Sequence, residues 1–161
     1  RFNLLSHQQL VTVEQEVNAV QEYVKLQQKR FGSRIKFVLK IQTDISKLTI
    51  PPFMLLTFVE NAICHGLEPK IEGGFVCLNI KLRNNNVLYR ILDTGIGMES
   101  KDRLLINTEE FDNPNFDGSV HGVGIKNIMY RLHLLYCGKE SFTLYSKKGR
   151  GSMIIINVPQ H

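Results

Sequence analysis

Apolar residues recur at helical spacing in three stretches of the chain. Every third or fourth position is apolar in each stretch, which predicts helices over residues 13–31, 53–66 and 122–136. Thr12 and Gln15 form a capping box immediately before the first stretch, so its helix should begin at the following valine.

Between these helices the apolar residues alternate with polar ones, as in strands with one buried face. A turn of three asparagines at 84–86 joins two of these runs, and a turn rich in Lys and Gly joins the last two. The strands are predicted over 35–41, 76–82, 87–92, 142–146 and 153–158. Helices that alternate with hairpins indicate an α+β fold, with helices layered on one face of a mainly antiparallel sheet.

The composition is that of one ordinary globular domain. The chain has 161 residues, of which 43% are hydrophobic and 22% are charged. A net charge of +5 suits a nucleotide or an acidic partner, whereas the lack of an arginine-rich run argues against nucleic acid. Three cysteines without a C-x-x-C pair favour a reducing compartment over disulfides or zinc. The sequence contains no signal peptide and no apolar run of about 18 residues.

The middle helix carries a polar stripe on an otherwise apolar surface. Pro51-Pro52 suits its first turn, since proline there loses no hydrogen bond. Thr57, Asn61 and His65 follow at i, i+4 and i+8, and therefore share one face. Such a stripe is costly unless it faces a partner or a ligand. The alternative is a helix end whose histidine complements the dipole and whose asparagine bonds a loop.

Two glycine motifs follow in order. Asp93-Thr94-Gly95-Ile96-Gly97 comes directly after a strand, as either a turn or the D-T-G of an aspartic protease. The protease needs two such aspartates and an all-β fold, which the helical stretches disfavour. Gly122-Val123-Gly124 opens the last helix, where backbone N–H groups can approach a phosphate. Residues 99–121 between the motifs lack periodicity, as in a functional lid or a disordered loop.

Taken in order, these motifs resemble the GHKL ATP-binding domains, and among them the sensor histidine kinases of the LytS/YesM type. Residues 59–66 look like the N box, 93–97 like G1, 122–127 with 131–136 like G2, and Gly151-Ser152 like the closing G-T. The early sequence at 13–16, 23 and 28–31 is similar to the segment before the ATP domain in this subfamily. The resemblance implies a two-layer Bergerat sandwich with a mixed, mainly antiparallel sheet. Residues 1–11 would end an upstream segment, and 12–161 would form the catalytic domain.

The resemblance also implies roles for individual residues. Asn61 would hold Mg²⁺ against the triphosphate of ATP, and Glu60 would orient or activate the nucleophile. Asp93 would accept a hydrogen bond from the adenine amino group, and residues 99–121 would form a mobile lid. Other positions would contact the nucleotide: Gly95 and Gly97 by close approach, Gly122 and Gly124 at the phosphates, and Ser152 at the base edge.

The chain departs from the family pattern at Cys64, where these kinases often carry a lysine that reaches a phosphate. His65 keeps the next position and is expected beside the nucleotide. Lys126 could compensate for the missing cation, although a solvated helix surface is the simpler interpretation.

No H-F-x-x-N-like phosphoacceptor motif is present, and His7 lacks that context. The reactive histidine is therefore expected upstream, on a dimerisation domain, with a response regulator as the next partner. The parent would be a homodimeric sensor anchored in the cell membrane, and this chain its cytoplasmic part. The alternatives are an anti-sigma-factor-type serine kinase of the same superfamily and a degenerate module without ATP.

Overall fold

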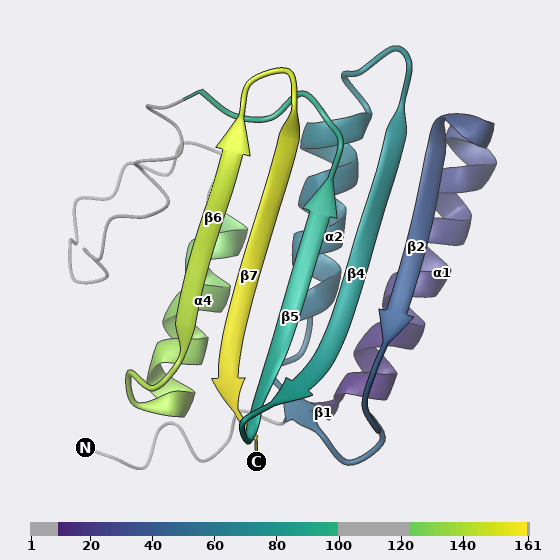
Figure 1. Cartoon of the computed structure of the whole chain (residues 1–161). Coiled ribbons are helices and arrows are strands. Elements are labelled where there is room, and N and C mark those ends of the chain that lie inside the picture. The colour runs from purple at the N-terminus through teal and green to yellow at the C-terminus, as the bar shows by residue number, and fades with distance from the viewer. Residues whose placement is uncertain (1–9, 100–122, 161) are drawn as a thin grey trace.

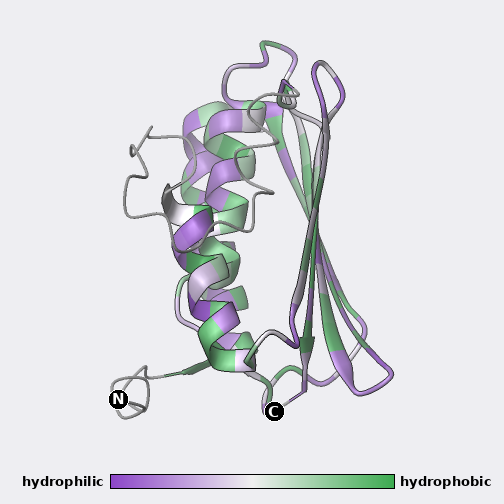
Figure 2. Cartoon of the chain, turned by 90° about the vertical axis from the view of Figure 1, so that its left-hand side faces the viewer, coloured by the Kyte–Doolittle hydropathy of each residue, from purple (hydrophilic) through white to green (hydrophobic). Residues whose placement is uncertain are grey.

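The structure is a computed structural model that describes residues 10–99 and 123–160. A five-stranded sheet forms one layer, and the helices α1 (Val13–Phe31), α2 (Met54–Asn61) and α4 (Val123–Tyr136) form the other. All three helices cover the same face of the sheet (Figures 1 and 2). This arrangement confirms the predicted α+β sandwich.

The strand order in the sheet is β2-β4-β5-β7-β6. β2 is parallel to β4, and every other neighbouring pair is antiparallel, so the sheet is mixed and mainly antiparallel. The strands are β2 (Ile35–Ile41), β4 (Gly74–Arg83), β5 (Asn86–Asp93), β6 (Ser141–Lys147) and β7 (Gly151–Pro159). A two-residue pair, β1 (Val11–Thr12) with β3 (Thr49–Ile50), was not predicted.

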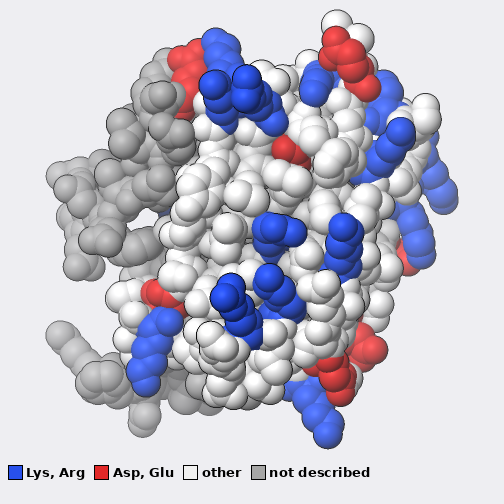
Figure 3. All heavy atoms as spheres, in the orientation of Figure 1, with Lys and Arg blue, Asp and Glu red and all other residues white. Residues whose placement is uncertain are grey.

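The core lies between the two layers. In one register row of the sheet, inward-facing apolar side chains come from β4, β5, β7 and β6: Leu78, Ile91, Ile154 and Leu144, all buried. The opposite face of the sheet is exposed, and Lys and Arg side chains gather on it (Figure 3). Its outward positions include Lys40, Lys81 and Arg90.

Helix α1 begins and ends as predicted. The Thr12 side chain accepts a hydrogen bond from the Gln15 amide at 3.1 Å, and the Gln15 side chain accepts one from the Thr12 amide at 2.9 Å. The predicted valine stripe is buried against the core at Val13, Val17, Val20 and Val24. Since this stripe is part of the main core, α1 belongs to the domain itself.

The β4–β5 hairpin has a tighter turn than predicted. Asn84 and Asn85 have φ values of 50° and 62°, and Arg83 pairs with Asn86 across the turn. Asparagine tolerates the left-handed region that such two-residue turns require. Asn86 is therefore the first residue of β5.

The start of α2 differs from the prediction. Pro51 and Pro52 precede the helix, which begins at Met54, so the prediction of proline in the first helical position is wrong. Phe53, the first residue of the predicted helix, instead occupies the cap position with a φ of 65° and is 63% exposed. The amides of Phe53 and Leu55 donate their hydrogen bonds to the carboxylate of Glu16, on α1.

The end of α2 continues as the π-helical segment η2 (Ala62–Leu67). Its wider turn is visible in the hydrogen bond from the Glu68 amide to the Ile63 carbonyl at 2.8 Å. Periodicity alone could not predict this change, and π-helical turns are frequent at functional sites. Over residues 10–99 and 123–160, no helix is long and apolar enough to cross a membrane.

Candidate functional site

A cavity of about 790 Å³ opens between α2 with η2, the ends of β5 and β7, and the first turns of α4. Volumes of this order are typical of small-molecule sites. The apolar part of its wall is formed by Phe58, Ile91, Ile96, Met98, Ile125 and Ile154. The polar part is formed by Asn61, His65, Asp93, Glu99, Lys148 and Ser152.

Asp93 is the last residue of β5, and its side chain faces the helix layer at the cavity wall. It is only 6% exposed, and burial raises the pKa of its carboxyl above the usual range. Hydrogen bonds from Gly95 and Ser152 and the charge of Lys70 oppose that rise in pKa. The Gly95 amide donates to Oδ1 at 2.8 Å. The site therefore contains a buried carboxylate whose negative charge is only partly offset by these hydrogen bonds and by Lys70.

Glycines let two backbone segments cross beneath this carboxylate. A Cβ on Gly95 would lie 2.3 Å from the carbonyl carbon and oxygen of Gly66, and one on Gly66 would lie 2.9 Å from Asp93 Oδ1. The Ile96 amide donates to the Gly66 carbonyl at 2.9 Å. Gly95 thus packs under η2 and does not line the cavity, whereas Gly66 does. The glycine at 66 is needed because no side chain fits beside the carboxylate.

Gly97 supports the same loop from the other side. Its φ is 66°, and a Cβ there would lie 2.1 Å from the Lys147 carbonyl oxygen. The Gly149 amide donates to the Ile96 carbonyl at 2.6 Å. The loop after β5 is therefore held between η2 and the β6–β7 turn, with Gly97 on the cavity wall.

Asn61, the last residue of α2, is half-buried at the cavity. Its amide nitrogen donates to the Thr57 carbonyl of the same helix at 2.8 Å, so the amide oxygen is directed elsewhere and can act as a ligand. Among the described residues, no three His, Cys, Asp or Glu side chains are grouped to hold a metal. A single amide oxygen fits Mg²⁺, which keeps several waters and takes its remaining ligands from phosphates.

The other polar residues of the middle helix do not all face the cavity. His65 lines the cavity and is exposed, whereas Thr57 lies beside α4, where a Cβ on Gly124 would be 3.3 Å from its methyl group. Glu60 is exposed and lies outside the cavity lining. The predicted stripe therefore brings Asn61 and His65 to the cavity, and the Asn61 amide nitrogen bonds its own helix.

Comparison with known proteins finds sensor kinases. No protein-family model matches the chain. It is 29% identical over 150 residues to the sensor histidine kinase YesM of Bacillus subtilis, across 93% of this chain and 24% of that protein. It is 27% identical over 159 residues to the sensor protein kinase HptS of Staphylococcus aureus, across 99% of this chain and 30% of that protein. The chain thus spans about a quarter to a third of the length of these relatives.

Solved structures agree on the fold. The mycobacterial sensor histidine kinase MprB superposes with a TM-score of 0.63 at 17% identity, over 95% of this chain and 99% of that one. ShkA in complex with AMPPNP superposes with a TM-score of 0.63 at 18% identity, over 99% of this chain and 34% of that one. The chain has the histidine kinase catalytic-domain fold. Its relatives in sequence are sensor histidine kinases of the YesM type.

Within this histidine kinase fold, Ser152 lies opposite Ser146 across the β6–β7 pair. Their hydroxyl oxygens are 2.9 Å apart, and Ser146 Oγ also accepts a hydrogen bond from the Met98 amide at 2.8 Å. Ser146 was not predicted as a site residue. The available signal was a polar residue at an inward position of an otherwise apolar strand face.

Lys148 at the cavity wall was also missed, and Glu99 beside it was predicted only as the first residue of the lid. Lys148 Nζ lies 2.5 Å from Glu99 Oε1, and this contact raises the pKa of the lysine. Both side chains belong to the cavity lining. Lys148 follows β6 in the turn that leads to Gly151-Ser152, but that motif did not indicate the lysine.

Some predicted residues of the histidine kinase motifs lie elsewhere. Lys126 is half-buried on α4 and does not line the cavity, and Gly124 is exposed in the first turn of that helix. Gly122 and residues 100–121 of the predicted lid lie outside the described residues.

Proposed function

We propose that this chain binds ATP with Mg²⁺ in the cavity and is the catalytic domain of a two-component sensor histidine kinase. The observation that carries the proposal is the buried Asp93 carboxylate in the wall of a 790 Å³ cavity, beside the glycine crossing. The similarity to YesM and HptS and the AMPPNP complex of ShkA support the same function.

The Asp93 end of the cavity suits the adenine base. The carboxylate accepts hydrogen bonds, so it can pair with the amino group of adenine, whereas guanine would present its O6 lone pairs. Ile91, Met98 and Ile154 provide an apolar wall for a flat ring. Ser152, whose hydrogen bonds to Asp93 lower that carboxyl's pKa, would hold the base edge.

The Asn61 end suits the triphosphate. The Asn61 amide oxygen would be the one protein ligand of Mg²⁺, and the ion would neutralise charge on the transferred phosphoryl group. Cys64 cannot replace the lysine that the family often carries at that position. Lys148 does not substitute for it, because Lys148 pairs with Glu99 and lies in the β6–β7 turn, which contacts the loop after Asp93. His65 would lie beside the nucleotide, with Gly122, Gly124 and Lys126 near the phosphates at the start of α4.

Glu60 would orient and deprotonate the histidine that attacks ATP. It is exposed, immediately before Asn61, and can be reached by a histidine on another domain. An imidazole nitrogen would attack the γ-phosphorus, the bond to the β–γ bridging oxygen would break, and ADP would leave. Glu60 would orient the ring and accept its proton. The histidine would belong to a dimerisation domain of a membrane-anchored homodimeric parent, and a response regulator aspartate would then receive the phosphoryl group.

Phosphoryl transfer to a separate acceptor domain tests this function. The chain is incubated with radiolabelled ATP, Mg²⁺ and a dimerisation domain that contains the candidate histidine, and the product is exposed to acid and to alkali. A phosphohistidine is expected, with label that is lost in acid and retained in alkali. An acid-stable phosphoserine would favour the serine kinase alternative, and an absence of nucleotide binding would favour the degenerate module.

A further inference from the structure

The N-terminus of α2 is capped by a side chain that lies 37 residues earlier in the chain. The Glu16 carboxylate accepts hydrogen bonds from the amides of Phe53 at 2.6 Å, Leu55 at 3.1 Å and Leu56 at 3.4 Å. Glu16 is only 4% exposed, and α2 has no side-chain cap of its own. A carboxylate at this end of a helix also meets the positive end of its dipole. The first turn of α2 is therefore fixed to α1.

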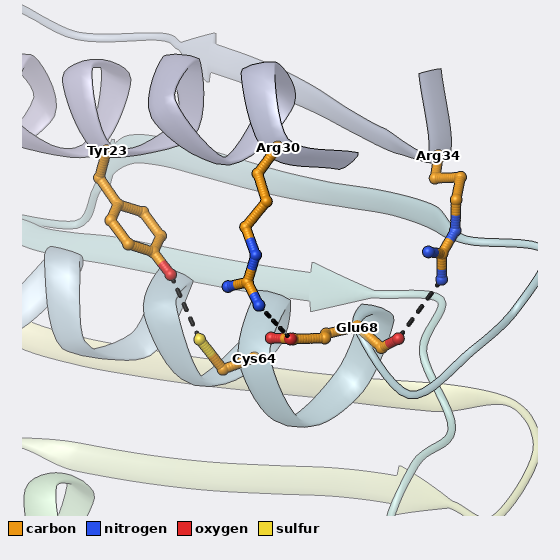
Figure 4. Close-up of polar contacts among 5 residues, drawn as sticks. All are labelled: Tyr23, Arg30, Arg34, Cys64 and Glu68. Carbon is orange, nitrogen blue, oxygen red and sulfur yellow. Dashed lines mark hydrogen bonds and ion pairs between the residues drawn. The ribbon is translucent and has the colours of Figure 1, made fainter. Parts of the chain in front are cut away.

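The continuation of α2 is fixed to α1 as well. The Tyr23 hydroxyl lies 3.3 Å from Cys64 Sγ in η2 (Figure 4). Partial burial and the neighbouring Cys64 raise the pKa of the Tyr23 phenol, so the hydroxyl stays neutral. Arg30 pairs with Glu68 at 3.1 Å, and Arg34 donates to the Glu68 carbonyl at 3.3 Å. Helix α1 and the residues that follow it therefore contact α2 and η2 at both ends.

These contacts lie on the side of α2 and η2 away from the cavity. Cys64 meets α1, whereas Asn61 and His65 line the cavity. Asn61 lies about 10 Å along the axis from Met54, so the rotation of α2 decides where the Asn61 amide oxygen points. The Asp93 end of the cavity is also held by the sheet, in which β5 pairs with β4 and β7.

We propose that Glu16 and Tyr23 are positioning residues that orient Asn61 toward metal-bound triphosphate. The inference rests on the proposed function and assigns a role to the early motif at 13–16 and 23. Neither residue lines the cavity, so both act through the helix that carries Asn61. Loss of either the Glu16 or the Tyr23 contact should therefore weaken the part of ATP affinity that depends on Mg²⁺. The part that depends on the adenine base should be unchanged.

The test is ATP affinity with and without Mg²⁺, measured on the full chain by calorimetry. In Glu16→Gln, affinity for ATP with Mg²⁺ should fall about 10- to 100-fold, as when residues that orient metal-ligating side chains are removed, and metal-free affinity should stay unchanged. Glu14→Gln is the matched control, because Glu14 lies in the same first turn but is exposed. Tyr23→Phe keeps the ring and removes only the hydroxyl. It should cause a smaller loss of the same kind, and it keeps the test decisive if Glu16→Gln does not fold.

Amide hydrogen exchange provides a readout without nucleotide. The amides of Leu55 and Leu56 should exchange faster in Glu16→Gln than in Glu14→Gln. Only Glu16→Gln removes the carboxylate that accepts hydrogen bonds from these two amides. An equal loss of metal-free and metal-bound affinity, or no loss of either, would overturn the positioning role. Failure of the unmodified chain to bind ATP would instead overturn the proposed function.

Discussion

Asp93 is buried where folding alone would favour a neutral side chain. Burial raises the pKa of its carboxyl, and only the hydrogen bonds from Gly95 and Ser152 and the charge of Lys70 oppose this. A buried, partly compensated carboxylate costs stability, and proteins usually retain such a group where function needs it. The family resemblance predicted Asp93 as an adenine acceptor, but the sequence could not indicate the depth of burial, which depends on the crossing of Gly66 and Gly95.

The variant Asp93→Asn should separate stability from binding. The folded pKa lies above the unfolded one, so the folded chain binds more protons between the two values, and stability falls as pH rises through the folded pKa. The cost of the carboxylate is thus fully present above the folded pKa and absent below the unfolded pKa. Urea unfolding should show that Asp93→Asn is at least as stable as the unmodified chain at neutral pH, with this advantage lost in acid. A less stable variant at neutral pH would contradict the account.

Tyr89 offers a second test at this scale. Its side chain is fully buried, and its hydroxyl has no hydrogen-bond partner within the described part of the chain. An unpaired buried hydroxyl costs about 1–3 kcal/mol, so Tyr89→Phe should raise the free energy of unfolding by roughly 1 kcal/mol. Chemical denaturation measures this change. A loss of stability would show that the hydroxyl has a partner.

At the scale of elements, local patterns predicted most of the fold. The valine stripe of α1 and the alternation in β2, β4 and β5 appear at the predicted positions, because each buries one face against a common core. The β1–β3 pair escaped prediction because two residues carry no periodicity. The Glu16 cap and the π-helical η2 were missed because they depend on contacts between segments far apart in the sequence.

Because η2 crosses the loop after β5, alanine substitution should reduce stability by different amounts at two glycines. Gly95→Ala would place a methyl group 2.3 Å from the backbone of Gly66, so the two segments must separate. The expected loss is about 1–3 kcal/mol or more, with weaker ATP binding, because Asp93 lies at the same crossing. Gly149→Ala is the control, since its positive φ adds strain of about 1–2 kcal/mol but its Cβ meets no atom within 4 Å.

Thermal unfolding and ATP titration of the two glycine variants check this prediction. Loss of ATP affinity in Gly95→Ala but not in Gly149→Ala would support the crossing as part of the site. Equal behaviour of the two variants would contradict it.

At the scale of the whole molecule, α1 is part of the two-layer fold and not a linker before it. Its four buried valines lie in the main core, and Glu16 caps the helix that carries Asn61. The order of motifs predicted a two-layer sandwich, but the parallel pairing of β2 with β4 could not be derived from alternation, which is the same for either direction.

Removal of α1 should therefore prevent folding. Four valines at about 1.5 kcal/mol or more each contribute at least about 6 kcal/mol, comparable with the whole stability of a domain. A chain of residues 32–161 should show no cooperative thermal unfolding by circular dichroism, whereas residues 10–161 should unfold cooperatively. Cooperative unfolding of the shorter chain would contradict the integral role of α1.

The central claim is that the cavity between Asp93 and Asn61 binds ATP with Mg²⁺. Calorimetric titration of the chain with ATP, with and without Mg²⁺, tests it most directly, beside Asp93→Asn. The account predicts one ATP per chain, tighter binding with Mg²⁺, and a loss of roughly 10- to 150-fold in Asp93→Asn, as for a hydrogen bond to a charged group. Absence of binding at millimolar ATP, or equal binding by Asp93→Asn, would contradict it.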